Sequence, residues 1–483
     1  MELGVGRIVL AMIAICLWPA VAISLFRTLP LRLATLWTIL GGQLLLPVGA
    51  AIKFEMIPQF DKMSVPNLCA FIGCLILARG RKKIAASIGL TELLMAVFVI
   101  GPAITSELNG DVIIIGDRVL PGVGIYDGIS TVETSLISLM PFFLGRRYLR
   151  GAADNLAILE VIVVAGLMYS IPLLFEIRFS PQLHYWVYGY YPTDFIQQMR
   201  EGGYRPMVFM GHGLLAAFFV MTVAVSAAAL WRIRVQIFKL PPAGVTIYLS
   251  VLLFLCKTLG ATVYGLIFVP LMRFANPRTL MRIAQILAVI ALLYPTLRSF
   301  DVFPTKLLVS GASSVSVERA ESLKFRFDNE DSLLKRASER LLFGWGRYGR
   351  SRVYAEWGQD ISITDGHWVL TLGQFGVFGF LAEFGLLTIG ILRASAALRF
   401  AKSESEKVCL AALAIIVSVN IVDLLPNSGL IPWTWLLAGA LLGRVEALRA
   451  TITQDVHRAE KPHLISLGAV PRIRKHKINP ISR

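Results

Sequence analysis

The chain has 483 residues, of which 56% are hydrophobic and only 16% are charged, and its mean hydropathy is +0.67. This composition excludes an ordinary soluble globular protein. The net charge of +16 would indicate nucleic-acid binding in a soluble protein, but the cytoplasmic loops of membrane proteins also collect lysine and arginine. We therefore expect an all-α polytopic membrane protein with no nucleic-acid partner.

Apolar runs that can cross a hydrocarbon core of about 30 Å recur along the whole chain. They predict about 12–14 transmembrane helices, with thirteen as the best count. The pair at 243–272 fits either two short spans or one long broken span. The candidate spans are 8–26, 34–52, 65–78, 84–104, 130–144, 155–174, 206–231, 243–257, 259–272, 280–296, 368–392, 408–424 and 430–443.

Basic residues concentrate in connectors that are separated by even numbers of spans, for example 79–83, 146–150 and 232–239. The positive-inside rule places these connectors in the cytoplasm. The N-terminus is then external and the C-terminal tail is cytoplasmic. The same topology places the two longest polar connectors, 175–205 and 298–367, on the outer side.

This topology divides the chain into four parts. Residues 1–297 are predicted to form a transmembrane bundle that includes the outer loop at 175–205, which is rich in aromatic residues and arginine. Residues 298–367 form a large outer loop that carries amphipathic helices, and residues 368–443 form the C-terminal transmembrane helices. Residues 444–483 form a basic tail, which we expect to lie near anionic lipid headgroups.

The sequence indicates no cofactor and no metal. The five cysteines all fall within apolar spans and show no paired or zinc-binding spacing. The chain contains no P-loop, no dinucleotide-binding fingerprint and no HExxH motif. Energy coupling through ATP is therefore not expected within this chain.

The large loop at 298–367 is nearly neutral, with eleven Lys or Arg and ten Asp or Glu. Its apolar residues predict an amphipathic helix from Asp331 to Leu342, which Gly344 ends. The following segment, GWGRYGR at 344–350, combines glycines with arginine forks that suit phosphate oxygens. It fits a pyrophosphate cradle and equally an interfacial belt of tryptophan and snorkelling arginine.

Asp365 and His367 stand at the mouth of the span that follows the loop. A lone histidine is more often structural than catalytic, but imidazole can accept a proton near neutral pH. Asp365 fits either a catalytic group or a cap of the following helix. Glu330, in the same loop, is a further candidate base.

The other outer loop contains several tyrosines and one tryptophan, which suit stacking on sugar rings. Tyr188 belongs to this group, and Arg200 and Arg205 follow it near the entrance of the next span. The alternative is an aromatic belt with snorkelling arginines. Because both loops fall on one side, we expect them to share a site.

Two segments of the chain resemble a known family. FGWGRYGR, followed after a spacer by SITDGHWVLTLGQFGVFGFLAEFGLL, resembles the signature region of the bacterial O-antigen ligase and polymerase superfamily. Gly373, Gly376 and Gly379 match its G-x-x-G pattern, and REGGYRPMVFMGHGL resembles its other periplasmic segment. The family's usual His-Asn dipeptide is His-Trp here, at His367 and Trp368.

The resemblance implies a bundle related to membrane glycosyltransferases in the bacterial inner membrane, with its active face in the periplasm. It implies an undecaprenyl-diphosphate-linked oligosaccharide as donor and a glycan or lipid as acceptor, with flippase and chain-length regulator proteins as partners. Catalysis would fall to His367, Asp365 and Glu330. The expected diphosphate ligands are Arg200, Arg205, Arg319, Arg326, Arg347 and Arg350, and the expected sugar contacts are Tyr188, Trp345 and Trp368.

On this interpretation an acceptor hydroxyl attacks the anomeric carbon of the donor and inverts it, while arginine charge helps the diphosphate to leave. One alternative is a flippase for lipid-linked oligosaccharides, which should carry ionisable residues at the membrane midplane in paired repeats. Another is a polyprenyl-monophosphate sugar transferase, which needs an acidic pair in its first outer loop. Glu55 and Asp61 are present there but are not adjacent.

Overall fold

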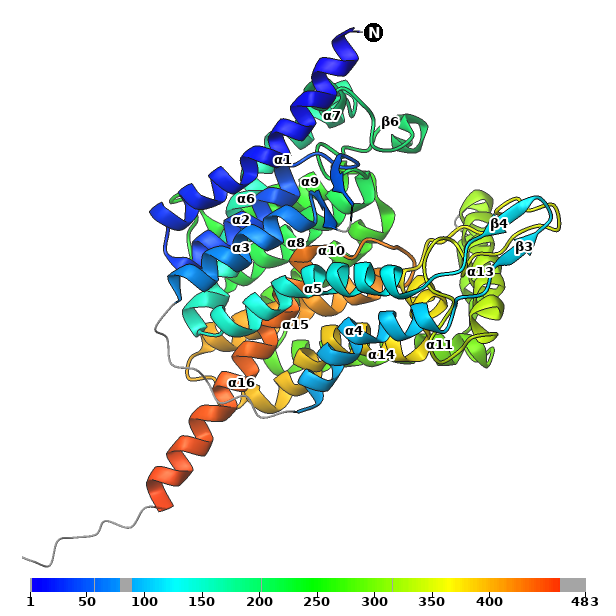
Figure 1. The fold of residues 1–483 in the computed structure, drawn as a ribbon. Helices are drawn as coiled ribbons and strands as arrows, with labels where there is room; N and C mark the ends of the chain where they lie inside the picture. The colour runs from blue at the N-terminus through cyan, green and yellow to red at the C-terminus, as the bar shows by residue number, and fades with distance from the viewer. Residues whose placement is uncertain (1, 56, 79–88, 201, 315, 461–483) are drawn as a thin grey trace, which may run out of the picture.

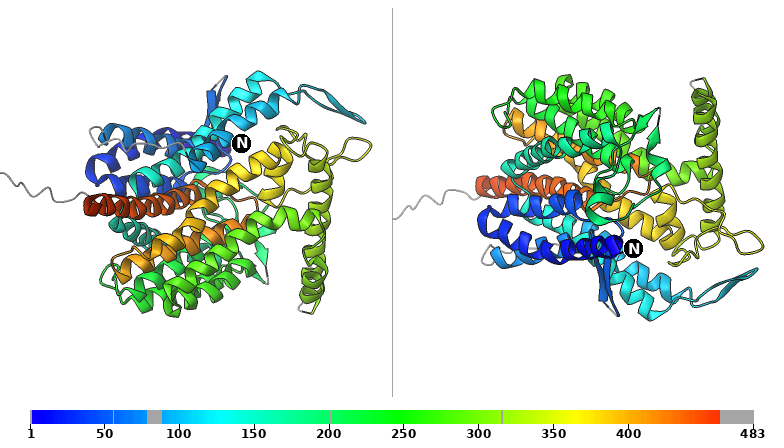
Figure 2. Two further views of the ribbon diagram at one scale, coloured as in Figure 1. Left: turned by 90° about the horizontal axis from the view of Figure 1, so that it is seen from below. Right: turned by 90° about the horizontal axis from the view of Figure 1, so that it is seen from above.

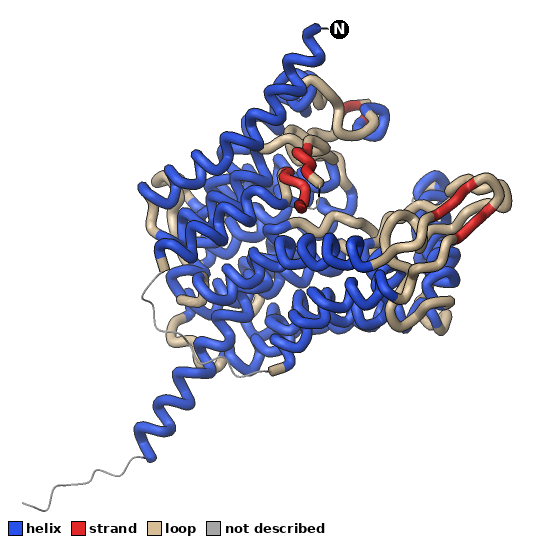
Figure 3. The backbone as a smooth tube through the Cα atoms, viewed as in Figure 1, coloured by secondary structure: helices blue, strands red, loops and turns tan. Residues whose placement is uncertain are grey.

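The computed structural model describes residues 2–55, 57–78, 89–200, 202–314 and 316–460 (Figure 1). These residues are almost wholly helical, and their strands form three short antiparallel hairpins. Figure 3 shows the strands only in the connections beyond the helix ends. The predicted all-α fold class is confirmed.

Thirteen helices coincide with the thirteen predicted spans. They are α1 (Glu2–Thr28), α2 (Leu31–Leu45), α3 (Ser64–Leu77), α4 (Leu90–Glu107), α5 (Ile125–Tyr148), α6 (Ala152–Phe179), α8 (Gly213–Arg232), α9 (Pro242–Leu255), α10 (Leu259–Phe274), α11 (Pro277–Ser299), α14 (His367–Leu398), α15 (Glu404–Asp423) and α16 (Pro432–Glu460). The region 243–272 therefore forms two helices, because the chain turns at Lys257 with a positive φ of 50°.

Eight of the described helices are long and apolar enough to cross a membrane: α1, α4, α5, α6, α8, α11, α14 and α15. The protein is therefore a multi-pass membrane protein. The apolar helices α2, α3, α9 and α10 have 15, 14, 14 and 16 residues. At about 1.5 Å per residue they are roughly 21–24 Å long, which is shorter than a hydrocarbon core of about 30 Å.

Close helix contacts in the bundle depend on small residues. α5 and α16 pack against each other, and Gly145 of α5 faces the backbone of α16. A Cβ atom on Gly439 of α16 would lie 2.0 Å from the carbonyl oxygen of Phe142. Such small-residue contacts are the usual way in which membrane helices approach closely.

The remaining elements lie in the connections. They are the helices α7 (Leu183–Tyr188), α12 (Thr305–Ser313) and α13 (Val317–Ser338), the 3-10 helix η1 (Phe195–Gln198), and the strands β1 (Ala51–Phe54), β2 (Ile57–Asp61), β3 (Ile113–Ile115), β4 (Arg118–Leu120), β5 (Met199–Arg200) and β6 (Gly203–Tyr204). α13 is longer than the helix predicted at 331–342. Neither glycine nor proline interrupts the sequence between Val317 and Phe343, so the helix extends towards the N-terminus.

The two predicted outer loops do not lie together. Figures 1 and 2 show α12 and α13 crossing one end of the bundle, beside the projecting β3–β4 hairpin. The segment with α7, β5 and β6 lies in another part of the molecule, where α7 packs on α1 and β6 packs on α6. α16 leaves the bundle at the end opposite to α13 (Figure 1).

Candidate functional site

The helix that follows the large loop is broken at Gly376. This residue has φ +66° and ψ −165°, which no helix contains. A Cβ atom at this position would lie 2.3 Å from the carbonyl carbon of Leu342, so the position requires glycine. The span predicted at 368–392 is present as α14, but two helical pieces meet within it at Gly376.

Backbone groups of the large loop form hydrogen bonds with the amides and carbonyls of α14 that lose their helical partners at Gly376. The amides of Val377 and Phe378 donate to the carbonyls of Leu341 and Leu342 at 2.8 and 3.3 Å. In return, the amides of Trp345 and Gly346 donate to the carbonyls of Gly373 and Gln374, both at 2.9 Å. The glycine-rich turn at 344–346 and the glycines of the following span are thus one structural unit, in which each replaces the other's missing hydrogen bonds.

The break brings His367 to Glu383. In a straight helix, residues sixteen positions apart lie about 24 Å from each other. Here His367 Nε2 lies 3.1 Å from Glu383 Oε1, so the chain folds back sharply at Gly376. Thr371 Oγ1 donates to the other oxygen of Glu383 at 2.6 Å. Glu383 is buried, and its carboxylate orients the half-buried imidazole.

The end of the next helix fixes the backbone of His367. Its amide lies 2.9 Å from the carbonyl of Leu424 and 3.1 Å from that of Asn427, both in the connection between α15 and α16. The first turn of α14 is therefore attached to this connection. The histidine has a fixed backbone and a fixed ring, which is the arrangement that general acid–base chemistry requires.

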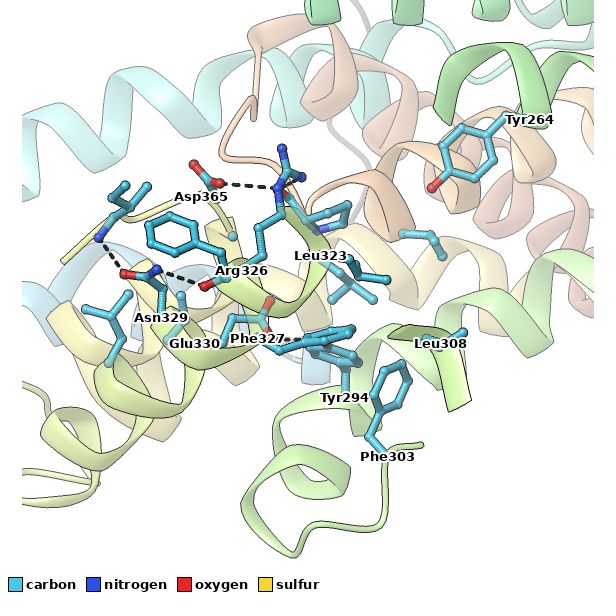
Figure 4. Close-up of a pocket in the computed structure, with 18 residues that line it drawn as sticks. Tyr264, Tyr294, Phe303, Leu308, Leu323, Arg326, Phe327, Asn329, Glu330 and Asp365 are labelled. Carbon is cyan, nitrogen blue, oxygen red and sulfur yellow. Dashed lines mark hydrogen bonds and ion pairs between the residues drawn. The ribbon is translucent and has the colours of Figure 1, made fainter. Parts of the chain in front are cut away.

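A cavity of about 240 Å³ lies beside this position, under α12 and α13 (Figure 4). The ends of α10, α11, α14 and α15 complete its walls, and most of its lining is apolar or aromatic. Its volume is below the roughly 300–1,000 Å³ of sites that enclose a drug-sized ligand, so it suits one part of a larger substrate. Its polar lining residues are Tyr264, Tyr294, Arg326, Asn329, Glu330 and Asp365.

Arg326 and Asp365 face each other at the edge of the cavity (Figure 4). Arg326 Nε lies 3.5 Å from Asp365 Oδ2, and the two side chains are 36% and 44% exposed. Arg326 also donates to the carbonyl of Pro426 at 3.4 Å. Among the described residues that line the cavity, Arg326 is the one cation. A substrate anion that displaced the Asp365 carboxylate would bind the guanidinium group of Arg326, which is already positioned at the cavity.

Glu330 lies deeper and is already engaged. Tyr294 Oη donates to its carboxylate at 3.0 Å and Arg298 Nε at 3.3 Å. Burial raises the pKa of Glu330 above its usual range, while the hydrogen bond from Tyr294 and the charge of Arg298 oppose that shift. Because Arg298 also bonds to Phe327 and Asp331, this network fastens α13 to α11.

Two predicted site residues of the GWGRYGR segment, the diphosphate ligand Arg350 and the sugar contact Trp345, are structural in this conformation. Arg350 is fully buried and donates to Asp111 Oδ1 and to the carbonyls of Trp345, Asp111 and Pro121. Trp345 is buried, and the guanidinium carbons of Arg336 and Arg340 lie 3.4 and 4.2 Å from its ring centroid. The segment therefore tethers the β3–β4 hairpin to the loop, and none of its residues lines the cavity. Because the guanidinium group of Arg350 is buried, its N–H groups are not accessible to a diphosphate.

The remaining predicted residues lie in different places. Trp368 is buried directly behind the cavity, with its ring 5.1 Å from that of Tyr294, and Arg347 is half-buried outside the lining. Arg205 is buried beside Gly213, and Tyr188 donates to the carbonyl of Leu45 at 2.6 Å. The side chains of two predicted ligands lie outside the described residues: Arg200 and Arg319.

The expectation of a site shared by both outer loops is therefore not met by this cavity, since none of the described side chains of 175–205 lines it. Sequence reasoning also missed Glu383, Tyr264 and Tyr294. Glu383 had a usable signal, because a lone acid within an apolar span is a functional candidate. Within the described part of the chain, no group of three His, Cys, Asp or Glu side chains is placed to bind a metal.

Comparison with known proteins adds no family assignment: no protein-family model matches the chain, and no curated protein sequence matches it either.

Proposed function

We propose that the protein transfers a glycan from an undecaprenyl-diphosphate-linked donor to an acceptor hydroxyl at the periplasmic face of a bacterial inner membrane. It would act as a polymerase or ligase in the synthesis of a surface polysaccharide. The observation that carries the proposal is the cavity at one end of the bundle, whose edge holds the cation Arg326 and the acid Asp365. The His367–Glu383 pair begins two residues after Asp365, next to the lining residue Gly366.

Arg326 is the residue best placed to receive the diphosphate. Its guanidinium is partly exposed, and Asp365, its acidic partner, is the group that an anion would displace. Planar guanidinium donors match phosphate oxygens, and the charge that develops on the leaving diphosphate makes them most useful in the transition state. The apolar and aromatic remainder of the cavity suits the first sugar and the adjoining lipid.

His367 supplies the proton acceptor. When Nε2 donates its hydrogen to Glu383, the lone pair of the ring lies on Nδ1. The acceptor oxygen forms a bond to the anomeric carbon as the carbon–oxygen bond to the diphosphate breaks. The proton of the hydroxyl moves to Nδ1, and undecaprenyl diphosphate leaves with the electron pair. A single displacement of this kind inverts the anomeric centre.

The test compares Arg326→Ala with Arg352→Ala in cells whose lipid-linked oligosaccharides carry a radioactive sugar. Arg352 is a matched control, because it is a partly exposed arginine of the same loop that pairs with Asp360 outside the cavity. We expect Arg326→Ala to reduce polymer formation roughly 100-fold or more, as loss of a transition-state donor does. Arg352→Ala should leave it near normal.

The location of the accumulated intermediate tests the reaction itself. Glycan transfer predicts that unpolymerised lipid-linked units accumulate on the outer face. A flippase, the alternative that the sequence leaves open, predicts accumulation on the inner face. Normal polymer in the Arg326→Ala variant, or a product that retains the anomeric configuration of the donor, would contradict the proposal.

A further inference from the structure

A second cavity, of about 110 Å³, lies beside the connection between α15 and α16. The junction of β2 and α3, the middle of α5 and the start of α16 form its walls. Leu425 and Pro426 of the connection line the first cavity, whereas Leu430 lines the second, together with Pro432 at the start of α16. The connection at 424–431 thus contributes to the linings of both cavities through different residues.

The second cavity is polar but lacks positive charge. No lysine or arginine lines it among the residues that the structure describes, so it does not suit a diphosphate. Amides, hydroxyls and one carboxylate are the groups that pair with the hydroxyls of a sugar, since they supply both donors and acceptors. The polar lining consists of Gln59, Asp61, Ser64, Asn67, Thr134 and Ser138.

An aromatic wall accompanies these groups. Trp435 lines the cavity, and its ring lies 5.3 Å from that of Phe98 and 6.0 Å from that of Phe142. The two neighbours hold the indole in place, so the cavity combines a fixed aromatic surface with polar groups. This combination of apolar faces and polar edges is complementary to a pyranose ring.

One polar atom in the wall has no partner. Asn67 is only 1% exposed, and its Nδ2 donates to the carbonyl of Ile137 at 3.2 Å. Its Oδ1 is buried and has no hydrogen-bond partner among the described residues. A buried acceptor without a donor costs free energy until a donor reaches it, and a ligand hydroxyl can be that donor.

We infer that the second cavity binds the hydroxyl-rich glycan acceptor, an inference that rests on the proposed function. The first cavity, with Arg326, then takes the charged end of the donor, and the second takes an uncharged sugar of the acceptor. The connection at 424–431 also carries the carbonyls of Leu424 and Asn427, which accept hydrogen bonds from the amide of His367. The proposed proton acceptor is therefore fastened to the boundary between the two substrates.

The probe is the repeat-unit oligosaccharide that mild acid releases from the lipid-linked pool of cells lacking this protein. Binding to the purified full-length protein in nanodiscs is measured by calorimetry for the wild type and for Ser138→Leu, which fills the cavity. Gln59→Ala is a milder second variant at an exposed position, in case the leucine prevents folding. Ser250→Leu, on α9 and outside both linings, controls for an added leucine in a membrane helix.

We expect Ser138→Leu to weaken oligosaccharide binding at least tenfold and Gln59→Ala to weaken it about threefold. Ser250→Leu should bind as the wild type does. Unchanged binding in folded Ser138→Leu and Gln59→Ala would overturn the inference while leaving the proposed function intact. If cells without the protein accumulate no lipid-linked oligosaccharide, the proposed function itself fails, which is a separate and recognisable result.

Discussion

His367 Nε2 lies 3.1 Å from Glu383 Oε1 although sixteen residues of a nominally helical segment separate the two. The contact exists because Gly376 reverses the chain and because the loop backbone satisfies the exposed amides and carbonyls at the break. A glycine, a loop and a buried acid thus act together to place one imidazole. On the proposed function, Glu383 is a positioning residue that acts through His367.

Replacing Glu383 tests this role. Glu383→Gln keeps the size of the side chain but removes the charge and permits the wrong imidazole tautomer. We expect kcat to fall about 10–100-fold, as loss of a residue that orients a functional histidine does, with little change in KM for the donor. Steady-state kinetics on purified protein provide the measurement, together with the pH profile of kcat, whose acidic limb should shift.

Thr371→Val provides the graded comparison, because it removes only the hydroxyl that donates to Glu383. Its effect on kcat should have the same sign and should be several times smaller. A purely structural role for the pair would instead lower the thermal midpoint of both variants while the surviving protein kept normal kcat and an unshifted pH profile. That outcome would remove Glu383 from the mechanism.

Gly376 should tolerate no side chain. Gly376→Ala places a Cβ atom 2.3 Å from the carbonyl carbon of Leu342 and requires a left-handed φ of +66°. We expect a loss of about 1–3 kcal/mol in unfolding free energy from backbone strain alone, and loss of transfer activity because His367 and Glu383 separate. Thermal unfolding in detergent and the activity assay measure the two effects.

Gly311→Ala is the control for this substitution. Gly311 lies in α12, and a Cβ atom there would meet nothing within 4 Å. Alanine is a better helix former than glycine, so this variant should be neutral or slightly more stable. Equal behaviour of the two alanine variants would show that the break in α14 is not required.

The helices were predictable from sequence because apolar runs separated by polar connectors recur along the chain. Arg326, Glu330 and Asp365 could be named as candidates because they are ionisable residues of one polar loop, but their meeting at one cavity depends on the path of α13. The reversal at Gly376 was not predictable, since the glycine pattern of the span is compatible with an ordinary helix. The burial of Arg350 was also not predictable, because its partner Asp111 is 239 residues away in a loop without a recognisable motif.

Substitution of Arg350 tests whether this arginine has a structural role or binds substrate. Its side chain is fully buried against Asp111, so Arg350→Ala leaves buried acceptors without donors. We expect a loss of about 1–3 kcal/mol in unfolding free energy, the cost of leaving a buried acceptor without its donor, because Asp111 is 47% exposed and keeps Arg340 as a partner. Arg347→Ala, at a half-buried position three residues earlier, should cost less than about 1 kcal/mol. Chemical unfolding in mixed micelles compares the stability of the two variants. If Arg350→Ala has normal stability but no longer binds the donor, Arg350 binds the diphosphate, as the sequence predicts.

Lys62 gives the protein a pH-dependent stability. It lies between β2 and α3, and its Nζ donates to the carbonyls of Leu46 and Phe209 at 3.0 and 2.5 Å. Burial lowers the pKa of Lys62 from 10.5 to about 7. Between these two values the unfolded chain binds more protons than the folded protein, so the unfolding free energy rises with pH above about 7. Below pH 7 both states are protonated and the contribution is constant.

Lys62→Met removes this dependence, since the variant has no proton to lose at that position. The stability of the wild type relative to Lys62→Met should therefore increase from pH 7 to pH 9, by at most about 1.4 kcal/mol per pH unit. Other groups titrate in the same range, so Lys53→Met, at an exposed position of β1, provides the reference. Thermal midpoints measured at half-unit intervals test the difference. Parallel curves for Lys62→Met and the wild type would show that the lysine is already charged, with the two carbonyls compensating for its burial.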